Sequence, residues 1–137
     1  KPATVYFQTY ENNTKMISEI TSKNPDIFLE RELEIRKKNK LPPFQRFISL
    51  ILTGDNEIKL EKEAINFKNF IENKIEGKIL GPVNAPLFRL KRKFRIRFLI
   101  RGLKSMKLQS SLAKIITKYK FSSGIKLSVD VDPINFN

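Results

Sequence analysis

The sequence predicts an α+β fold with the element order β-α-β-β-α-β, the split ferredoxin-like arrangement, built as a two-layer sandwich. Three observations predict it. The 137 residues suffice for one domain with a core and a short extra segment. Residues 94–101 alternate between apolar and mostly basic side chains, as a half-buried strand does. Residues 57–75 and 105–119 place apolar side chains at helical spacing.

Three elements are expected before this domain. Residues 5–10 are rich in β-branched and aromatic side chains, which predicts a short strand. A short helix is expected at 16–21. The Asn-Pro-Asp sequence at 24–26 is a typical helix start, with Asn as the cap and Pro in the first position, so a connector helix is expected over 26–38. The Leu-Pro-Pro sequence at 41–43 ends it.

The first half of the predicted sandwich begins with a strand at 44–53. Both faces of this strand are largely apolar, which predicts a central position in the sheet. The helix at 57–75 follows, with its glutamates expected on a solvated face. A short strand is expected at 78–80, and the Pro-containing residues 83–91 are expected to form a connector without regular structure.

The second half contains the most regular alternation in the chain. In the strand at 94–101, one face carries Phe94, Ile96, Phe98 and Ile100, and the other carries Arg95, Arg97, Leu99 and Arg101. Gly102 is expected to break this strand, and a helix follows at 105–119. The last strand, 125–131, is expected to turn Ile125, Leu127, Val129 and Val131 inward. With both helices on one face of the sheet, the other face is free.

The composition excludes several classes of function. The chain contains neither His nor Cys, which excludes a Ser-His-Asp triad, a thiolate zinc site, a Cys nucleophile and disulfides. Its glycines are isolated, and no GxxxxGK[ST] phosphate loop is present. No run of 18 apolar residues is present either, so no segment is expected to span a membrane, and no membrane partner is predicted. We therefore predict no catalytic residue and no metal site for this chain. The sequence begins with Lys1 rather than Met, and we expect it to be a piece of a longer protein.

The charge distribution points to a polyanionic partner. The sequence carries 27 Lys and Arg against 14 Asp and Glu, a net charge of +13 with a pI near 10.1. From Gly77 to Val129 no acidic residue occurs. A basic loop followed by an arginine-bearing strand suits contact with phosphates. The candidate nucleic-acid-binding residues are Arg89, Lys91, Arg92, Lys93, Arg95, Arg97 and Arg101.

Alternatives stay open at this point. The same basic surface would serve as a solvated face or as a docking face for another domain, and the charge pattern does not separate DNA from RNA. Asp130 and Asp132 are two apart on the expected last strand, where they could share a face and hold Mg²⁺. Ion pairing with nearby arginines, or a position at the strand end, is the plainer expectation for these carboxylates.

Several segments together resemble one family. Residues 79–87, Ile-Leu-Gly-Pro-Val-Asn-Ala-Pro-Leu, resemble its "LGP-x-x-A-P" connector, and residues 130–136, Asp-Val-Asp-Pro-Ile-Asn-Phe, resemble its closing "D-x-D-P-x-x-F". Residues 28–44 are similar to its "F-x-x-x-E-x-x-x-R…P-P-[FY]" segment, and residues 7–10 to the strand that follows its last helicase motif. The family is that of PriA, primosomal protein N′, the bacterial replication-restart DNA helicase; the basic residues 91–95 depart from its usual loop.

The resemblance implies a cytoplasmic, ATP-dependent 3′→5′ DNA helicase that restarts abandoned replication forks. The family's ATP and Mg²⁺ motifs and its zinc-binding cysteines lie upstream, so no cofactor is expected in this segment. Residues 1–24 would be the end of the second helicase lobe, 25–43 a connector helix, and 44–137 a C-terminal domain with a fold similar to a small-subunit ribosomal protein. In the family this domain helps bind forked or single-stranded DNA.

The resemblance also implies protein partners, namely single-strand binding protein and other primosome proteins. The acidic, aromatic-ended tail of single-strand binding protein would suit the start of the helix at 105–119, where free backbone N–H groups attract anions. The candidate partner-binding residues there are Lys104, Met106, Lys107 and Gln109. Two rival functions remain: an RNA-binding module like the ribosomal protein, and a scaffold whose basic face packs on acidic motor surface.

Overall fold

The computed structural model describes residues 3–6, 8–10, 15–22 and 26–134. The chain divides into two units, Lys1–Asn39 and Lys40–Asn137. Within the described residues, no helix combines the length and the apolar character needed to cross a bilayer.

The described residues of the first unit form two helices, α1 (Lys15–Ile20) and α2 (Asp26–Lys38), both close to their predicted ranges. Arg31 of α2 pairs with the nearly buried Glu19 of α1, with 2.8 Å between Nη2 and Oε2. The predicted strand at 5–10 is wrong for residues 5–6 and 8–10, which form no strand. A strand needs a neighbour for its backbone N–H and C=O groups, and the described part of this unit offers none. The predicted cap, residues 24 and 25, lies outside the described residues.

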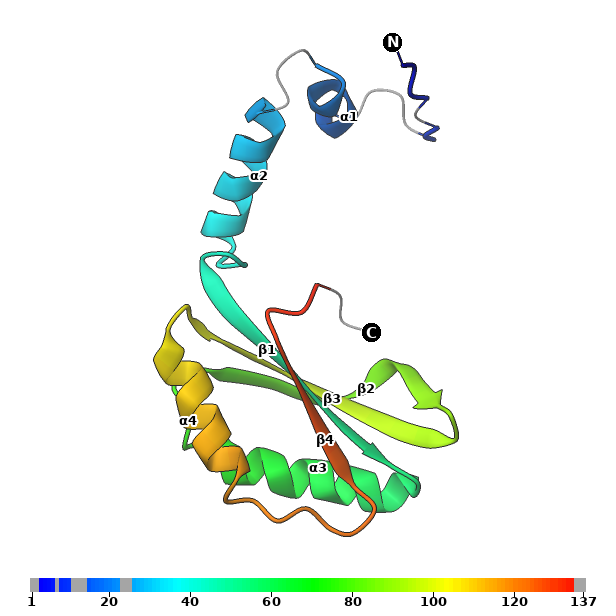
Figure 1. The fold of residues 1–137 in the computed structure, drawn as a ribbon, viewed down its shortest axis with the longest axis vertical. Coiled ribbons are helices and arrows are strands. Elements are labelled where there is room, and N and C mark those ends of the chain that lie inside the picture. The colour runs from blue at the N-terminus through cyan, green and yellow to red at the C-terminus, as the bar shows by residue number, and fades with distance from the viewer. Residues whose placement is uncertain (1–2, 7, 11–14, 23–25, 135–137) are drawn as a thin grey trace. The chain divides into compact units, whose positions relative to one another are not determined.

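The second unit has the predicted β-α-β-β-α-β order (Figure 1). Its elements are β1 (Gln45–Gly54), α3 (Glu57–Glu72), β2 (Lys78–Leu90), β3 (Lys93–Leu103), α4 (Met106–Ile116) and β4 (Lys126–Val131). The strands form one antiparallel sheet in the order β2-β3-β1-β4, and α3 and α4 cover the same face of it. β1 and β2 are therefore parallel with β3 between them, which is the split βαβ arrangement.

The core lies between the sheet and the two helices. Alternate residues of the two inner strands face the helices, and the register pairs Leu50 of β1 with Phe98 of β3. The buried cluster consists of Ile48, Leu50, Leu52, Leu60, Ala64, Phe67, Ile71, Ile96, Phe98, Ile100, Leu108 and Leu112. Phe67 packs edge-on against Phe98, with ring centroids 5.9 Å apart. This burial fixes which face of β3 is free, because the side chains of a strand alternate.

The predicted connector at 83–91 is wrong, because β2 runs without interruption from Lys78 to Leu90. Its pairing with β3 shifts register twice, between Leu80 and Val83 and between Asn84 and Arg89. The shifts coincide with Pro82 and Pro86, which lack the N–H that a sheet ladder requires. An edge strand tolerates such residues, so prolines that predicted a loop instead mark irregularities in an edge strand. β3 likewise continues through Gly102 to Leu103.

The last strand is less enclosed than predicted. Val129 pairs with Leu50 and so faces the helices, yet it is 47% exposed, and Val131 is 37% exposed. α4 leaves this edge uncovered. A mostly apolar groove of about 440 Å³ lies between α4 and β4, lined by Ile48, Gln109, Leu112, Ala113, Ile116, Thr117, Val129 and Val131. The sequence pattern identified the face of β4 correctly, but it did not determine how far the helix extends over it.

One glutamate of α3 also departs from the prediction. Glu63 is only 6% exposed, although the charge pattern placed it on a solvated face. Its carboxylate accepts hydrogen bonds from the hydroxyl and the N–H of Ser122, at 2.6 and 3.4 Å. Burial of the Tyr119 hydroxyl, helped by its hydrogen bond to Glu63 and by that negative charge, raises the pKa of Tyr119 to about 12. Glu63 therefore anchors the segment between α4 and β4 onto α3.

Candidate nucleic-acid interface

The free face of the sheet carries the three arginines that the alternation predicted. Arg95, Arg97 and Arg101 of β3 are partly buried, while Ile96 and Phe98 between them are fully enclosed in the core. The three arginines therefore share one face of β3, with Leu99 between Arg97 and Arg101. Alternate residues of a strand are about 6.8 Å apart, a spacing that lets successive side chains contact successive points along an extended polyanion.

Two lysines that sequence reasoning did not select extend this basic face across the sheet. Lys78 at the β2 edge is paired directly with Arg101. Lys126 at the β4 edge is paired with Thr53, which is in turn paired with Arg95. Directly paired residues share a face, so the cations run from one edge of the sheet to the other. The register between strands is the signal that finds them.

The predicted basic loop is in fact the tight turn of a hairpin. Leu90 pairs with Lys93, so the turn between β2 and β3 consists of Lys91 and Arg92 alone. Both have positive φ, 50° and 65°, as the central residues of a type I′ turn do. For a side-chain-bearing residue this conformation costs about 1 kcal/mol or more. The turn thus holds two exposed cations at the tip of the hairpin.

The other two cations of the hairpin are tied to neighbouring groups. The guanidinium of Arg89 lies over the ring of Phe94, 5.4 Å from its centroid. Lys93 Nζ lies 3.6 Å from Asp55 Oδ1, with both side chains largely solvated. Exposed pairs of this kind contribute little stability, but they hold the two side chains beside the turn.

Arg95 has a structural contact besides its place on the basic face. Four residues of β2, 85–88, lie opposite this single residue of β3, because Asn84 pairs with Ile96 and Arg89 with Phe94. Arg95 Nη1 donates a long hydrogen bond of 3.4 Å to the carbonyl oxygen of Leu87 in this excursion. Loss of Arg95 would therefore alter the hairpin as well as its charge.

The two candidate carboxylates do not share a strand face. Asp132 lies beyond the end of β4, with φ of 53°, whereas Asp130 lies within the strand. Its Oδ2 is 3.2 Å from Arg46 Nε, and its Oδ1 accepts the N–H of Phe47 at 3.1 Å. The expectation of an ion pair at a strand end is confirmed for Asp132. Across the described ranges, no three His, Cys, Asp or Glu side chains are grouped as metal ligands.

The start of α4 has the free backbone N–H groups that were predicted, but the candidate polar residues there do not all share one face. Ser105 is the N-cap but makes no side-chain capping bond, which leaves the first N–H groups of the helix without that partner. Leu103 and Met106 are each 75% exposed. Lys107 and Gln109 are two positions apart, about 200° around the helix, so they do not share a face. Gln109 lines the groove beside β4 instead.

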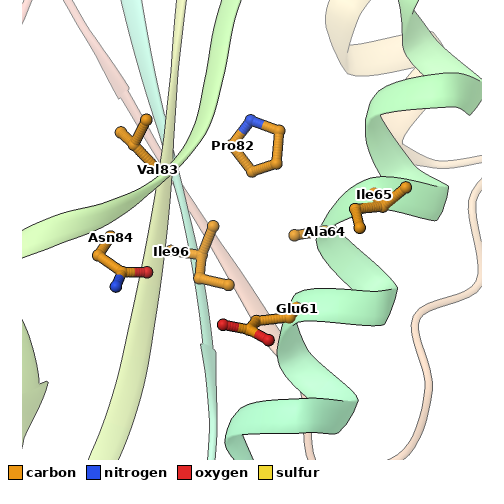
Figure 2. Close-up of a pocket in the computed structure, with 7 residues that line it drawn as sticks. All are labelled: Glu61, Ala64, Ile65, Pro82, Val83, Asn84 and Ile96. Atoms are coloured by element: carbon orange, nitrogen blue, oxygen red, sulfur yellow. The ribbon is translucent and has the colours of Figure 1, made fainter.

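A second hollow lies on the helix side of the sheet, away from the basic face. Figure 2 shows Glu61, Ala64 and Ile65 of α3 opposite Pro82 and its neighbours on β2. The hollow measures about 210 Å³. Its charged group is a carboxylate, which would repel a polyanion, so it does not belong to the candidate interface.

Comparison with known proteins supplies the family context. The family described as the Primosomal protein N C-terminal domain matches residues 37–134. The Replication restart protein PriA of Rickettsia conorii is 36% identical over 132 residues, covering 96% of this chain and 20% of the relative. Its counterpart in Rickettsia typhi is 37% identical over the same length, and that of Chlamydia muridarum 27% over 135 residues. The chain spans about a fifth of the length of these relatives.

Proposed function

This chain belongs to the primosomal protein N C-terminal domain family of replication restart proteins, and from that membership we propose that it is the DNA-binding accessory domain of a replication-restart helicase. The observation that supports the proposal is the continuous basic surface formed by the hairpin tip and the free face of β3. Its members are Lys78, Lys91, Arg92, Lys93, Arg95, Arg97, Arg101 and Lys126, while Arg89, which pairs with Phe94, lies on the other face of the hairpin beside the turn. Such a surface binds phosphates by releasing counterions, without catalytic chemistry of its own.

The proposal extends to the parent protein. We propose that the parent is a cytoplasmic, ATP-dependent 3′→5′ helicase whose ATP, Mg²⁺ and zinc sites lie outside this chain. Residues 1–24 would then end its second motor lobe, and residues 25–43 would connect that lobe to the DNA-binding domain. Within this division the domain contributes affinity for branched or single-stranded DNA, and the motor contributes strand separation.

The test is a titration of labelled fork DNA, single-stranded DNA and duplex RNA by fluorescence anisotropy at several salt concentrations. We expect the fork to bind more tightly than duplex RNA, and each phosphate contact to contribute about 0.7–0.9 to the log–log salt slope. Changing Arg92, Lys93 and Arg95 to Ala should lower both the affinity and the slope. A control, Lys62→Gln with Lys114→Gln, removes two exposed lysines from α3 and α4, one charge fewer than the triple variant. If the triple variant binds DNA no differently from that control, this surface is not the DNA site.

A second binding role is favoured by the exposed start of α4. We propose that Leu103 and Met106, beside the uncapped N–H groups of the first turn, receive the acidic, aromatic-ended tail of single-strand binding protein, with Lys104 and Lys107 contributing polar contacts. An NMR titration with a tail peptide tests this. Shifts at residues 103–109 that a Lys107→Glu change abolishes would support the role, whereas shifts confined to residues 89–93 would refute it.

A further inference from the structure

The turn between β2 and β3 carries residues that its backbone disfavours. Lys91 and Arg92 occupy the two central positions with φ of 50° and 65°, where Asn-Gly is the least strained choice. Backbone strain of this kind persists where the surrounding structure enforces it, and it is concentrated at functional sites. Lys91 and Arg92 make the fold less stable than Asn-Gly would at this turn. Their presence is therefore better explained by a function than by stability.

The surroundings leave these two side chains available to a partner. Both are exposed, and within the described part of the chain neither has an ion pair, whereas Lys93 pairs with Asp55 and Arg89 lies over Phe94. The turn geometry directs them outward from the end of a two-stranded ribbon. Their positions are set by the backbone rather than by a mobile loop, which lowers the entropy lost on binding.

The dimensions of the ribbon select one kind of site. The backbones of paired strands lie about 4.8 Å apart, and the side chains on both strands widen the ribbon further. With its side chains the hairpin is too wide for the ~6 Å minor groove of DNA, but it suits the ~12 Å major groove. β1 lies beside β3 as far as the Gly54–Phe94 pair, so the ribbon projects past the rest of the sheet by the Leu90–Lys93 pair and the turn. That is roughly 3.4 Å of strand plus the turn, less than the ~8.5 Å depth of the major groove, and the long side chains of Lys91 and Arg92 supply the remaining reach.

Single-stranded DNA is a poorer fit for this tip. Proteins that hold single strands stack bases on exposed aromatic rings. Phe88 and Phe94, the aromatic residues nearest the turn, pack against each other with centroids 5.4 Å apart and lie against the core cluster. On the free face of β1, the ring of Phe47 is only 8% exposed. The described surface around the tip therefore offers cations without stacking platforms.

We infer that the β2–β3 hairpin tip enters the major groove of a duplex arm, where Lys91 and Arg92 contact base edges and the flanking phosphates. Lys and Arg donate to guanine O6 and N7 in that groove. The inference rests on the proposed DNA-binding function and adds to it the kind of DNA and the element that reads it. The open basic face would then follow the backbone of the same arm.

The decisive variant is Lys91→Asn with Arg92→Gly, which supplies the preferred type I′ sequence and removes both cations. We expect it to melt roughly 5 °C higher than the wild-type chain and to bind a duplex oligonucleotide about tenfold more weakly. A rise in melting temperature shows that lost binding does not come from misfolding. The control Lys62→Gln with Lys114→Gln should bind within about twofold of wild type, because its lysines lie on the helical layer.

The groove is tested with two probes. Duplex DNA carrying glucosylated hydroxymethylcytosine has a blocked major groove, and wild type should bind it as weakly as the Asn-Gly variant does. Netropsin, which fills the minor groove, should leave wild-type binding unchanged. Competition by netropsin, or full affinity for the glucosylated duplex, would overturn the inference while leaving the DNA-binding function intact. Absence of DNA binding by the wild-type chain would instead remove the proposed function itself.

Discussion

Ser122 Oγ donates a 2.6 Å hydrogen bond to Glu63 Oε2, joining the segment after α4 to a buried carboxylate on α3. The two residues are 59 positions apart. The tie holds Tyr119 and Phe121 against Phe67, with ring centroids 5.0 Å from it in each case. β4 follows this segment, so the contact helps to position the edge of the sheet that carries Lys126.

Replacing Glu63 should weaken the whole domain. Glu63→Ala leaves the Ser122 hydroxyl and N–H without their charged acceptor, and we expect a loss of about 2–3 kcal/mol in the free energy of unfolding. Glu63→Gln keeps one acceptor oxygen and should cost about 1 kcal/mol less than Ala does. Urea denaturation followed by circular dichroism measures both. Equal stabilities for wild type and Glu63→Ala would show that the network contributes nothing.

The Tyr119 hydroxyl should make stability depend on pH at the alkaline end. Its pKa is raised from 10.0 to about 12 in the folded chain, so folding favours the neutral hydroxyl. This contribution is complete below pH 10 and is lost as the pH rises from 10 through 12. Tyr119→Phe removes the titrating group. We therefore expect the stability difference between wild type and Tyr119→Phe to be constant below pH 10 and to shrink above it, as measured by urea denaturation across that range.

Gly81 should tolerate no side chain. Its φ is +104°, and a Cβ would lie 2.7 Å from the carbonyl oxygen of Arg97 on the neighbouring strand. Gly124 also has positive φ, +85°, but nothing lies within 4 Å of its Cβ position. Gly124→Ala should thus cost about 1 kcal/mol, from backbone strain alone. Gly81→Ala should cost at least about 2 kcal/mol more, because β2 must move away from β3; thermal melts of the two variants supply the comparison.

Asp132 should stabilise the end of the sheet by two separable contacts. Asn at this position keeps an acceptor for the Phe47 N–H and tolerates φ of 53°, but it loses the ion pair with Arg46. We expect a cost of about 0.5–1 kcal/mol for Asn and about 1 kcal/mol more for Ala. Only the ion-pair part should diminish in high salt. A salt-independent cost for Asp132→Asn would contradict the assignment.

The chain should hydrolyse no ATP. It contains no phosphate-binding loop and no His or Cys, so DNA-stimulated phosphate release should stay at the buffer level in a phosphate assay. A catalytically competent replication restart protein would serve as the positive control. Measurable turnover by this chain would show that its boundary with the motor has been placed wrongly.

The local patterns in the sequence were sufficient for most of the second unit. The alternation at 94–101 fixed which side chains of β3 are buried, because burying Ile96 and Phe98 leaves Arg95 and Arg97 on the opposite face. Helical spacing located α3 and α4 to within a few residues at their ends. These patterns reflect the direction of successive side chains, which repeats every 2 residues in a strand and every 3.6 residues in a helix. That repeat is a local property, so it does not depend on which element packs against the strand or helix.

The sequence by itself therefore determined the element order, the central position of β1, the basic face and the family resemblance. Only the tertiary structure decided that the proline-containing segment at 83–90 is an edge strand, that Lys91 and Arg92 form a strained turn, and that Glu63 is buried. It also brought Lys78 and Lys126 onto the arginine face. Each of these depends on pairing or packing between segments far apart in the chain. A residue's own neighbours in sequence cannot encode that information, because strand register and helix coverage are set by the core as a whole.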